Sequence, residues 1–296
     1  MPYLGELSAL LTAFLWAGSS MAFASATARL GSFNINITRL LLAAVYLLIL
    51  IPVAGFDIGI SLKQGIYLCI SGVIGLSVGD TFLFKSYELI GARVTMLMMS
   101  LAPAIAALLS YYILNETISI TGIIGITITI AGIVLVVLDR EVNSFHKNKI
   151  ISIGVIYAFI AAAGQGAGLV LAKMAFQEGS INGFVATGFR IIASLFLILP
   201  FAILTNRYKN PIKIFNANRT ALWLTVAGSF LGPFFGITFS LIAIANTNVG
   251  IASTIMAMVP ILMLPLVKIL YKEKLTIRAI VGAFIAVGGV AVLFLR

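Results

Sequence analysis

The sequence predicts an all-α integral membrane protein of ten transmembrane helices, arranged as two inverted five-helix repeats around a central cavity. The first observation is composition, because 61% of the 296 residues are hydrophobic and 9% are charged, whereas soluble domains have about 45–50% and about 25%. The second is length, since ten crossings of about 20 residues each use most of the chain. The third is an internal repetition of special residues. No room remains for a soluble catalytic domain.

Apolar runs bounded by polar or turn residues give the predicted helices. The first run has no basic start and no obvious cleavage site, and it carries Glu6. We therefore expect it to remain as a span rather than to be removed as a signal peptide. In chain order the predicted ranges are 5–27, 33–54, 64–86, 92–114, 119–138, 150–174, 182–204, 220–243, 248–271 and 276–295.

The most polar stretch of the chain separates the fifth predicted helix from the sixth. Residues 139–149 hold six ionisable side chains, a composition typical of a linker. The predicted organisation is a first five-helix repeat at 1–138, a polar linker at 139–149 and a second five-helix repeat at 150–296.

The two halves align without a gap when 157 is added to every number from 62 to 138. The number of identical residue pairs in this alignment is barely above what so biased a composition gives by chance. The residues with special backbone or turn roles nevertheless coincide: Gly75 with Gly232, Gly79 with Gly236, Pro103 with Pro260 and Glu116 with Glu273. Such periodic coincidence indicates an internal duplication. Because each repeat has an odd number of helices, the second must enter the membrane upside down, as in many secondary transporters with a midplane site.

The run from Gly79 to Glu116 contains an ordered set of residues: Gly79, Asp80, Thr81, Ile90, Gly91, Ala92, Arg93, Pro103, Asn115 and Glu116. Trp16 and Arg39 come before this set, and Pro260, Glu273 and Thr276 follow in the second repeat. With these residues, and over nearly the whole chain, the sequence resembles an EamA-type member of the drug/metabolite transporter (DMT) superfamily. The resemblance implies ten helices around a central cavity and transport of small metabolites, often amino acids or related compounds and often outward. We expect a multi-pass protein of the plasma (inner) membrane.

One departure from related proteins bears on energy coupling. In small multidrug resistance proteins, a glutamate in the first helix couples protons to cationic drugs, whereas the comparable places here hold Trp16 and, in the sixth helix, Gln165. Neither side chain carries a proton at neutral pH. Glu6 lies about ten residues, or roughly 15 Å of helix, nearer the membrane surface. The sequence therefore disfavours proton-coupled drug antiport by that route.

Two arginines are the first candidates for substrate binding. Arg39 and Arg190 lie at similar depths in the second and seventh predicted helices, and charges inside a span should face protein or a wet cavity. A pair related by the pseudo-twofold axis would hold a carboxylate or phosphate from two sides. The alternative is that each snorkels to an interface or bonds to nearby carbonyls.

Asp80 and Lys85 are further charged candidates, in the second half of the third predicted helix. Their spacing of five residues suits no pair within one helix. Asp80 should instead pair with Arg93 or with an arginine from another helix, as a structural clamp or gate, or else contact substrate or a coupling ion.

Aromatic and amide side chains would complete a binding site. Trp16 and Gln165 hold matching positions, and Tyr87, Phe239 and Asn246 would add aromatic and polar lining, as small-ligand sites require. The alternative for Trp16 and Phe239 is lipid contact or core packing. The Gln165 amide should face a cavity or bond across helices, because lipid offers it no partner.

Pro103 and Pro260 lie in the middle of the fourth and ninth predicted helices. Each removes one backbone hydrogen bond, to the carbonyl of Met99 or Met256, and so predicts a kink. The freed carbonyls would bind an ammonium group or an ion beside a cavity, or the kinks would only shape the bundle.

The chemistry that the sequence excludes narrows the function. One cysteine and one histidine give no disulfide framework and no Cys/His metal cluster, and no phosphate-binding loop is present. An aspartyl protease needs two facing carboxylates, and Asp57 and Asp139 fall in loops or at a helix end. We expect no enzyme and no cofactor.

The net charge of +10 fits basic loops at a membrane rather than nucleic-acid binding.

The leading hypothesis is a secondary transporter, an exporter or exchanger, of a small zwitterionic or anionic metabolite such as an amino acid, working by alternating access. Efflux of amphipathic drugs or toxic compounds is the alternative, and a passive channel is a further one. The expected partners are a small-molecule substrate, the lipid bilayer and a possible coupling ion, with the chain a monomer or homodimer.

The positive-inside rule places both termini outside the cytoplasm, whereas eukaryotic relatives in the superfamily suggest termini inside.

Overall fold

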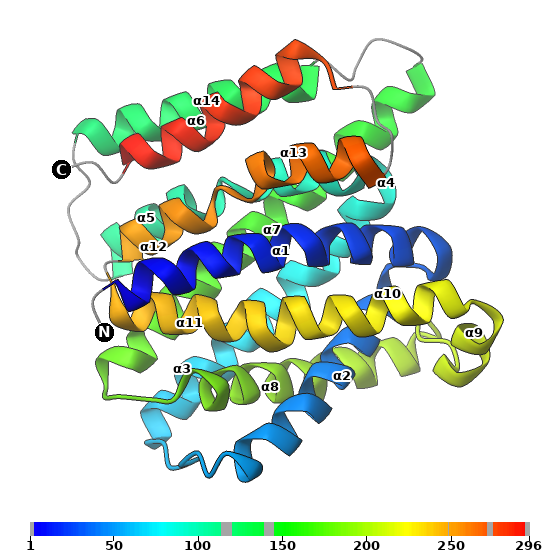
Figure 1. The fold of residues 1–296 in the computed structure, drawn as a ribbon, viewed down its shortest axis with the longest axis vertical. Coiled ribbons are helices and arrows are strands. Elements are labelled where there is room, and N and C mark those ends of the chain that lie inside the picture. The colour runs from blue at the N-terminus through cyan, green and yellow to red at the C-terminus, as the bar shows by residue number, and fades with distance from the viewer. Residues whose placement is uncertain (1–2, 114–119, 139–144, 248, 271–274, 294–296) are drawn as a thin grey trace.

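The computed structural model describes residues 3–113, 120–138, 145–247, 249–270 and 275–293. Within these ranges the chain is helical with short connections and has no strand, in agreement with the predicted all-α class. The helices form one bundle, and α1 begins on the same side of the molecule on which α14 ends (Figure 1).

The first half of the chain contains six α-helices and one π-helical segment. These are α1 (Leu4–Leu30), α2 (Ser32–Val53), α3 (Leu62–Gly72), η1 (Val73–Gly79), α4 (Asp80–Met99), α5 (Ala102–Ile113) and α6 (Ile120–Leu138). The second half contains α7 (Phe145–Gln177), α8 (Gly183–Leu204), α9 (Pro211–Ala217), α10 (Arg219–Ser229), η2 (Phe230–Gly236), α11 (Ile237–Asn246), α12 (Val249–Met256), α13 (Val259–Leu270) and α14 (Ile277–Leu293). Of the predicted linker, 139–144 lies outside the described residues and 145–149 forms the start of α7.

Among the residues that the structure describes, six helical stretches are long and apolar enough to cross a bilayer, by length and composition: 4–30, 32–53, 62–99, 152–177, 183–204 and 219–246. Four shorter apolar helices accompany them, at 102–113, 120–136, 259–269 and 277–292. These stretches support a multi-pass membrane protein. Within the described residues the predicted ranges 119–138 and 276–295 match α6 and α14 closely, whereas 92–114 and 248–271 are each divided between two helices.

The predicted helices 92–114 and 248–271 were expected to kink at their prolines, and an interruption near each proline confirms this prediction. The first is interrupted at Ser100 and Leu101, between α4 and α5, and the second at 257–258, between α12 and α13. Pro103 and Pro260 each stand second in the helix that follows, where a missing N–H costs nothing. The break precedes each proline because the proline has no N–H to bond the carbonyl four residues earlier and its ring crowds that carbonyl.

Side-chain caps explain several helix starts. Ser61 and Gln64 form a reciprocal capping box at the start of α3, and this arrangement satisfies backbone N–H groups of the first turn. The amide oxygens of Asn182 and Asn218 accept backbone N–H bonds at the starts of α8 and α10. These polar residues stop one helix and start the next, which is why the predicted starts at 182 and 220 lie within one residue of the observed ones.

The two halves repeat with constant offsets. The helix starts at 62, 73, 102 and 120 recur 157 residues later at 219, 230, 259 and 277. The second helix of each half, α2 or α8, has both bounds offset by 151 residues. The repetition includes the π-helical turns, so the internal duplication predicted from a few landmark residues extends to the backbone.

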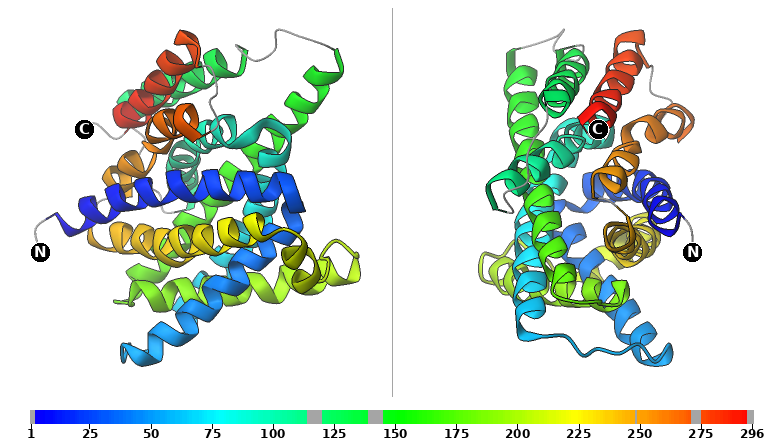
Figure 2. Two further views of the ribbon diagram at one scale, coloured as in Figure 1. Left: turned by 45° about the vertical axis from the view of Figure 1, so that its right-hand side comes forward. Right: turned by 90° about the vertical axis from the view of Figure 1, so that its left-hand side faces the viewer.

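The pair α6 and α14 shows that the repeats are inverted. A Cβ on Gly132 would meet Gly282 and Ala286, and a Cβ on its equivalent Gly289 would meet Gly125 and Thr129. Each set of contacts is the other set moved by 157 residues, which is the signature of a twofold axis. The two helices run antiparallel, side by side at one edge of the molecule (Figures 1 and 2), so the pseudo-twofold axis passes between them.

Glycines bring the halves into close contact at the centre. Gly75 and Gly79 of η1 pack against α7, where their nearest neighbours include the backbone of Gly164. In the second half, Gly232 and Gly236 of η2 pack against α1 at Ser19, Phe23 and Trp16. Small residues allow such approach between membrane helices. Each half therefore contributes the wall against which the other half's first helix lies.

Candidate substrate cavity

A cavity opens at the centre, between elements of both repeats. Its volume is about 110 Å³, well above the roughly 10–15 Å³ that holds one water, so it has room for several waters or a small solute. Its walls come from α1, α2, η1, α4, α5, α7, η2, α11, α12 and α13. The predicted site residues among its lining are Trp16, Arg39, Asp80, Tyr87, Gln165, Pro103 and Pro260.

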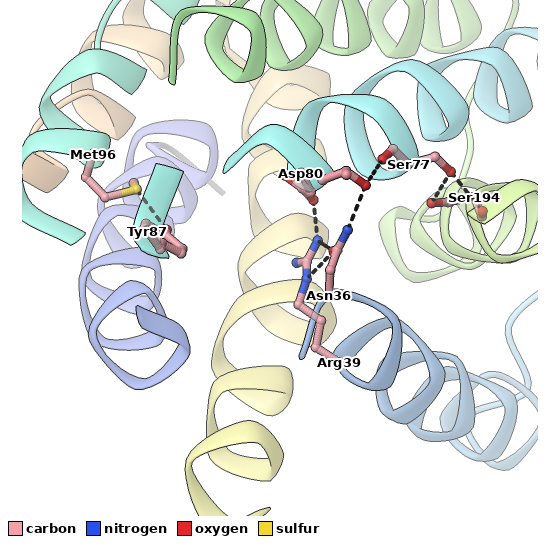
Figure 3. A network of polar contacts seen from close by, with 8 residues as sticks. Asn36, Arg39, Ser77, Asp80, Tyr87, Met96 and Ser194 are labelled. Atoms are coloured by element: carbon pink, nitrogen blue, oxygen red, sulfur yellow. Dashed lines mark hydrogen bonds and ion pairs between the residues drawn. The ribbon is translucent and has the colours of Figure 1, made fainter. Parts of the chain in front are cut away.

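An ion pair between Arg39 of α2 and Asp80 of α4 is the main charged feature of the wall. The Arg39 Nη2 donates to Asp80 Oδ2, and the two side chains are only 6% and 10% exposed. Asn36 Oδ1 accepts two further bonds from Arg39, from Nε at 3.0 Å and from Nη2 at 2.9 Å (Figure 3). Asp80 thus pairs with an arginine from another helix, as one of the sequence-based alternatives proposed, and the pair is held in one geometry.

Aromatic rings enclose the same guanidinium. The Arg39 Cζ lies 4.7 Å from the ring centroid of Phe84 and 5.6 Å from that of Phe23, within the range of cation–π attraction. Phe23 and Phe84 are themselves in contact, with centroids 5.3 Å apart. The rings exclude water from one side of the ion pair and strengthen its electrostatic attraction.

A chain of polar contacts runs from this pair to the second repeat. The Asn36 amide donates to Thr81 Oγ1 at 3.3 Å, and Thr81 Oγ1 donates to the Ser77 carbonyl at 2.5 Å. The Ser77 hydroxyl in turn lies 2.8 Å from both the carbonyl and the hydroxyl oxygen of Ser194 on α8 (Figure 3). The charged wall is therefore coupled by hydrogen bonds to a helix of the other half.

Arg190 is not part of the cavity surface, although it matches Arg39. Each arginine is the eighth residue of its helix, α2 or α8. Arg190 is 1% exposed, and its Nη2 approaches Gly75 and Gly168 behind the cavity wall. The predicted symmetric placement is present in the backbone, but only Arg39 lines the cavity in this structure.

The neutral candidates divide between the cavity and the periphery. Tyr87 is buried in the wall and its hydroxyl lies 3.2 Å from the Met96 sulfur (Figure 3). Trp16 and Gln165 face the cavity from α1 and α7. Phe239 instead stacks on Phe235, with centroids 5.9 Å apart, and Asn246 is exposed at the end of α11, where its amide bonds to the Ile242 carbonyl. The structure brings neither to the cavity.

Lys85 lies in a separate pocket. Its ammonium nitrogen is 5.4–5.6 Å from the ring centroids of Phe33, Phe82 and Tyr157. The pocket also contains Ser32, Glu88, Leu89, Ile153 and Arg207. Lys85 is therefore half-buried among aromatic rings, and the structure does not group it with the central cavity.

Several lining residues escaped the sequence-based prediction. The methionines Met96, Met99 and Met256, the hydroxyls of Ser19, Ser20, Ser100 and Ser253, and the rings of Phe23 and Phe84 all contribute to the wall. Asn36 had a usable signal, because an amide inside an apolar helix one turn before an arginine needs a partner. Met99 and Met256 were predicted only through the carbonyls that the prolines free, and the side chains of the methionines and serines had no signal, since both residue types are common in any membrane helix.

Comparison with known proteins agrees with this architecture. The sequence profile of the EamA-like transporter family matches residues 3–138 and 152–295. A search of curated proteins found no match. Among solved structures, the crystal structure of another protein aligns with a TM-score of 0.72 at 20% sequence identity. The alignment covers 98% of this chain and 96% of that chain. At that identity, the likeness shows the fold.

Proposed function

The chain belongs to the EamA-like transporter family, whose members are membrane transporters of the DMT superfamily, and we propose that it is a secondary transporter of a small zwitterionic or anionic metabolite such as an amino acid. Transport proceeds by alternating access, as export or exchange. The driving force is the gradient of the solute itself, of an exchanged solute, or of a coupling ion. The site of action is the plasma (inner) membrane.

The observation that carries this proposal is a buried ion pair in the wall of a cavity between two inverted repeats. Asp80 offers a carboxylate to an ammonium group, and Arg39 offers a guanidinium to a carboxylate. Charged groups are costly inside a membrane and are retained there for function. A zwitterion carries both complementary charges. Its ammonium group can bind Asp80 while its carboxylate binds Arg39, so that neither buried charge is left without a partner.

The helix breaks give the cavity a means of changing shape. Ser100, Pro103, Ala257 and Pro260 all line the cavity, at the two interruptions between α4 and α5 and between α12 and α13. Breaks of this kind absorb changes in backbone angle when one repeat rocks against the other. The α6–α14 contacts around the twofold axis supply a rigid junction for that movement.

Counterflow into liposomes tests the proposal. Purified protein is reconstituted in vesicles loaded with pooled amino acids and organic acids, and uptake of each labelled compound is measured without an ion gradient. Saturable accumulation of one class is the expected result. The variant Arg39→Gln should lose most of this uptake per molecule of folded protein, whereas Lys63→Gln, a change at a basic residue exposed outside the cavity, should retain it.

Two results would refute the proposal in different ways. Flux that rises linearly with concentration and shows no counterflow would indicate a passive channel. Equal uptake by wild type and Arg39→Gln would remove the role assigned to the ion pair.

Efflux of amphipathic or toxic compounds is the second candidate, because much of the cavity wall is apolar. Met96, Met99 and Met256 surround it, and methionine side chains adapt to differently shaped ligands. Accumulation of a lipophilic dye in cells, lowered by expression of the protein and insensitive to Arg39→Gln, would favour this candidate over metabolite transport.

A further inference from the structure

Arg190 is a fully buried guanidinium for which the described residues provide no ion-paired carboxylate, because Asp80, the acidic group that acts on it from nearby, is paired with Arg39. Arg190 is 1% exposed, and within the part of the chain that the structure describes neither its Nε nor its Nη2 has a hydrogen-bond partner. Leaving a buried charged donor unpaired is among the most costly arrangements in a protein. Such a residue needs an anion in at least one functional state.

The pseudo-twofold symmetry identifies the anion that is missing. The contact of α2 with α4 recurs between α8 and α11, because the bond between Asn36 and Thr81 at 3.3 Å has its equivalent between Thr187 and Thr238 at 3.2 Å. In the first repeat this contact also contains the Arg39–Asp80 ion pair. At the place equivalent to Asp80, the second repeat has Ile237.

The Arg190 guanidinium lies next to residues that line the cavity. Its Nη2 would lie only 3.3–3.4 Å from a Cβ at either Gly75 or Gly168, so two glycines make the space that the guanidinium occupies. Next to them on the same elements, Leu76 and Gln165 line the cavity, and so does Ile237. The Gln165 Oε1 lies 3.9 Å from the same Cβ position at Gly75. One layer of side chains therefore separates Arg190 from a bound solute.

The charges of the three buried groups sum to one uncompensated positive charge. Arg39 and Asp80 neutralise each other, and Arg190 is left over. We propose that Arg190 is a second anion receptor of this transporter, beside Arg39, and that a carboxylate of the solute takes on Arg190 the place that Asp80 takes on Arg39. The inference rests on the proposed transport function and narrows its substrates to solutes that carry a carboxylate.

The substitution Ile237→Asp tests this by supplying the missing carboxylate from the protein itself. Purified protein in detergent is unfolded thermally in sodium acetate and in sodium chloride of equal ionic strength. Wild type should be stabilised by acetate, because a ligand that binds only the folded state raises its stability. Ile237→Asp should melt at a higher temperature in chloride and lose the acetate response. Ile237→Asn, which alters polarity without adding charge, should keep the response.

The same variants in the counterflow assay report on transport. An internal carboxylate competes with the solute for Arg190, so Ile237→Asp should weaken the apparent affinity for a carboxylate solute by about tenfold or more. Arg190→Gln should also lose the acetate response, and if this variant fails to fold, Ile237→Asp still gives the answer.

The other outcomes overturn either the role proposed for Arg190 or the transport function on which it rests. Absence of an acetate response in wild type, or an equal response in Ile237→Asp, would show that Arg190 binds no carboxylate. A response to phosphate that Ile237→Asp abolishes, without one to acetate, would replace the carboxylate by a phosphate group. Acetate binding that depends on Arg190, in a protein without counterflow, would refute the transport function alone. Normal counterflow in Ile237→Asp would refute the role of Arg190 alone.

Discussion

Breaking the Arg39–Asp80 ion pair from one side should destabilise the protein strongly. In Asp80→Asn the shape of the side chain is kept, but the Arg39 guanidinium loses its counter-ion at a site where both side chains are at most 10% exposed. Removal of one partner from a buried pair costs about 3–5 kcal/mol. The two bonds from Arg39 to Asn36 remain, so we expect a value near the lower end, about 3 kcal/mol.

A double-mutant cycle measures this coupling. The free energy of unfolding is determined in mixed detergent micelles for wild type, Asp80→Asn, Arg39→Met and the double variant. Because the double variant leaves no buried charge alone, it should be less destabilised than the sum of the single variants by about 1–3 kcal/mol. Glu178→Gln, which removes the partner of the exposed Lys63 in a 2.7 Å ion pair, should change stability far less.

The reasoning would be refuted by additive single variants, or by an Asp80→Asn protein as stable as wild type. Either result would show that water or other polar groups already compensate the charges, and that the pair is open to solvent in the native state.

Three further predictions follow from the backbone. Changing Gly91 to Ala should cost about 1–3 kcal/mol of stability, because its φ of 73° and ψ of 171° lie in a region essentially restricted to glycine, although the space around it is open. Gly288→Ala in the interior of α14, also in open space, should instead gain about 0.5–1 kcal/mol. Equal signs in thermal unfolding would contradict the strain argument. Gly132→Ala and Gly289→Ala should destabilise by similar amounts, about 1–3 kcal/mol each, because they make equivalent contacts across the twofold axis; a large difference in unfolding free energy would show that the α6–α14 symmetry is broken. Pro103→Ala and Pro260→Ala should slow exchange without weakening substrate binding, since each favours a continuous helix; unchanged counterflow rates would mean that the breaks do not move.

The fold was predictable because its main constraints act locally along the chain. The length of each apolar run predicted the membrane-spanning helices, and cap residues such as Asn182 and Asn218 indicated where helices begin. The offset of 157 residues could be read from Gly75, Pro103 and their equivalents, because glycine and proline are required by backbone geometry rather than by side-chain packing. The π-helical turns η1 and η2 were not predictable, since no side-chain pattern distinguishes them from ordinary helix.

The candidate site was only partly predictable, because it depends on contacts between distant helices. A charge inside a span marked Arg39, Asp80 and Arg190 as important, but the sequence could not say which carboxylate pairs with which arginine. Phe239 and Asn246 were chosen as possible lining residues by residue type alone. Their helix α11 turns them toward Phe235 and toward the exposed helix end, an orientation that only tertiary packing determines.

The presence of Asp80 in one half and Ile237 in the other has a consequence for how such a protein can arise. Two separate five-helix chains of identical sequence, assembled in opposite orientations about a twofold axis, would carry the carboxylate twice or not at all. Only after the two copies are joined in one polypeptide can one copy keep the acid and the other lose it. Joining the copies thus gives the protein an odd number of charges around a twofold axis, a state that no pair of identical chains can reach.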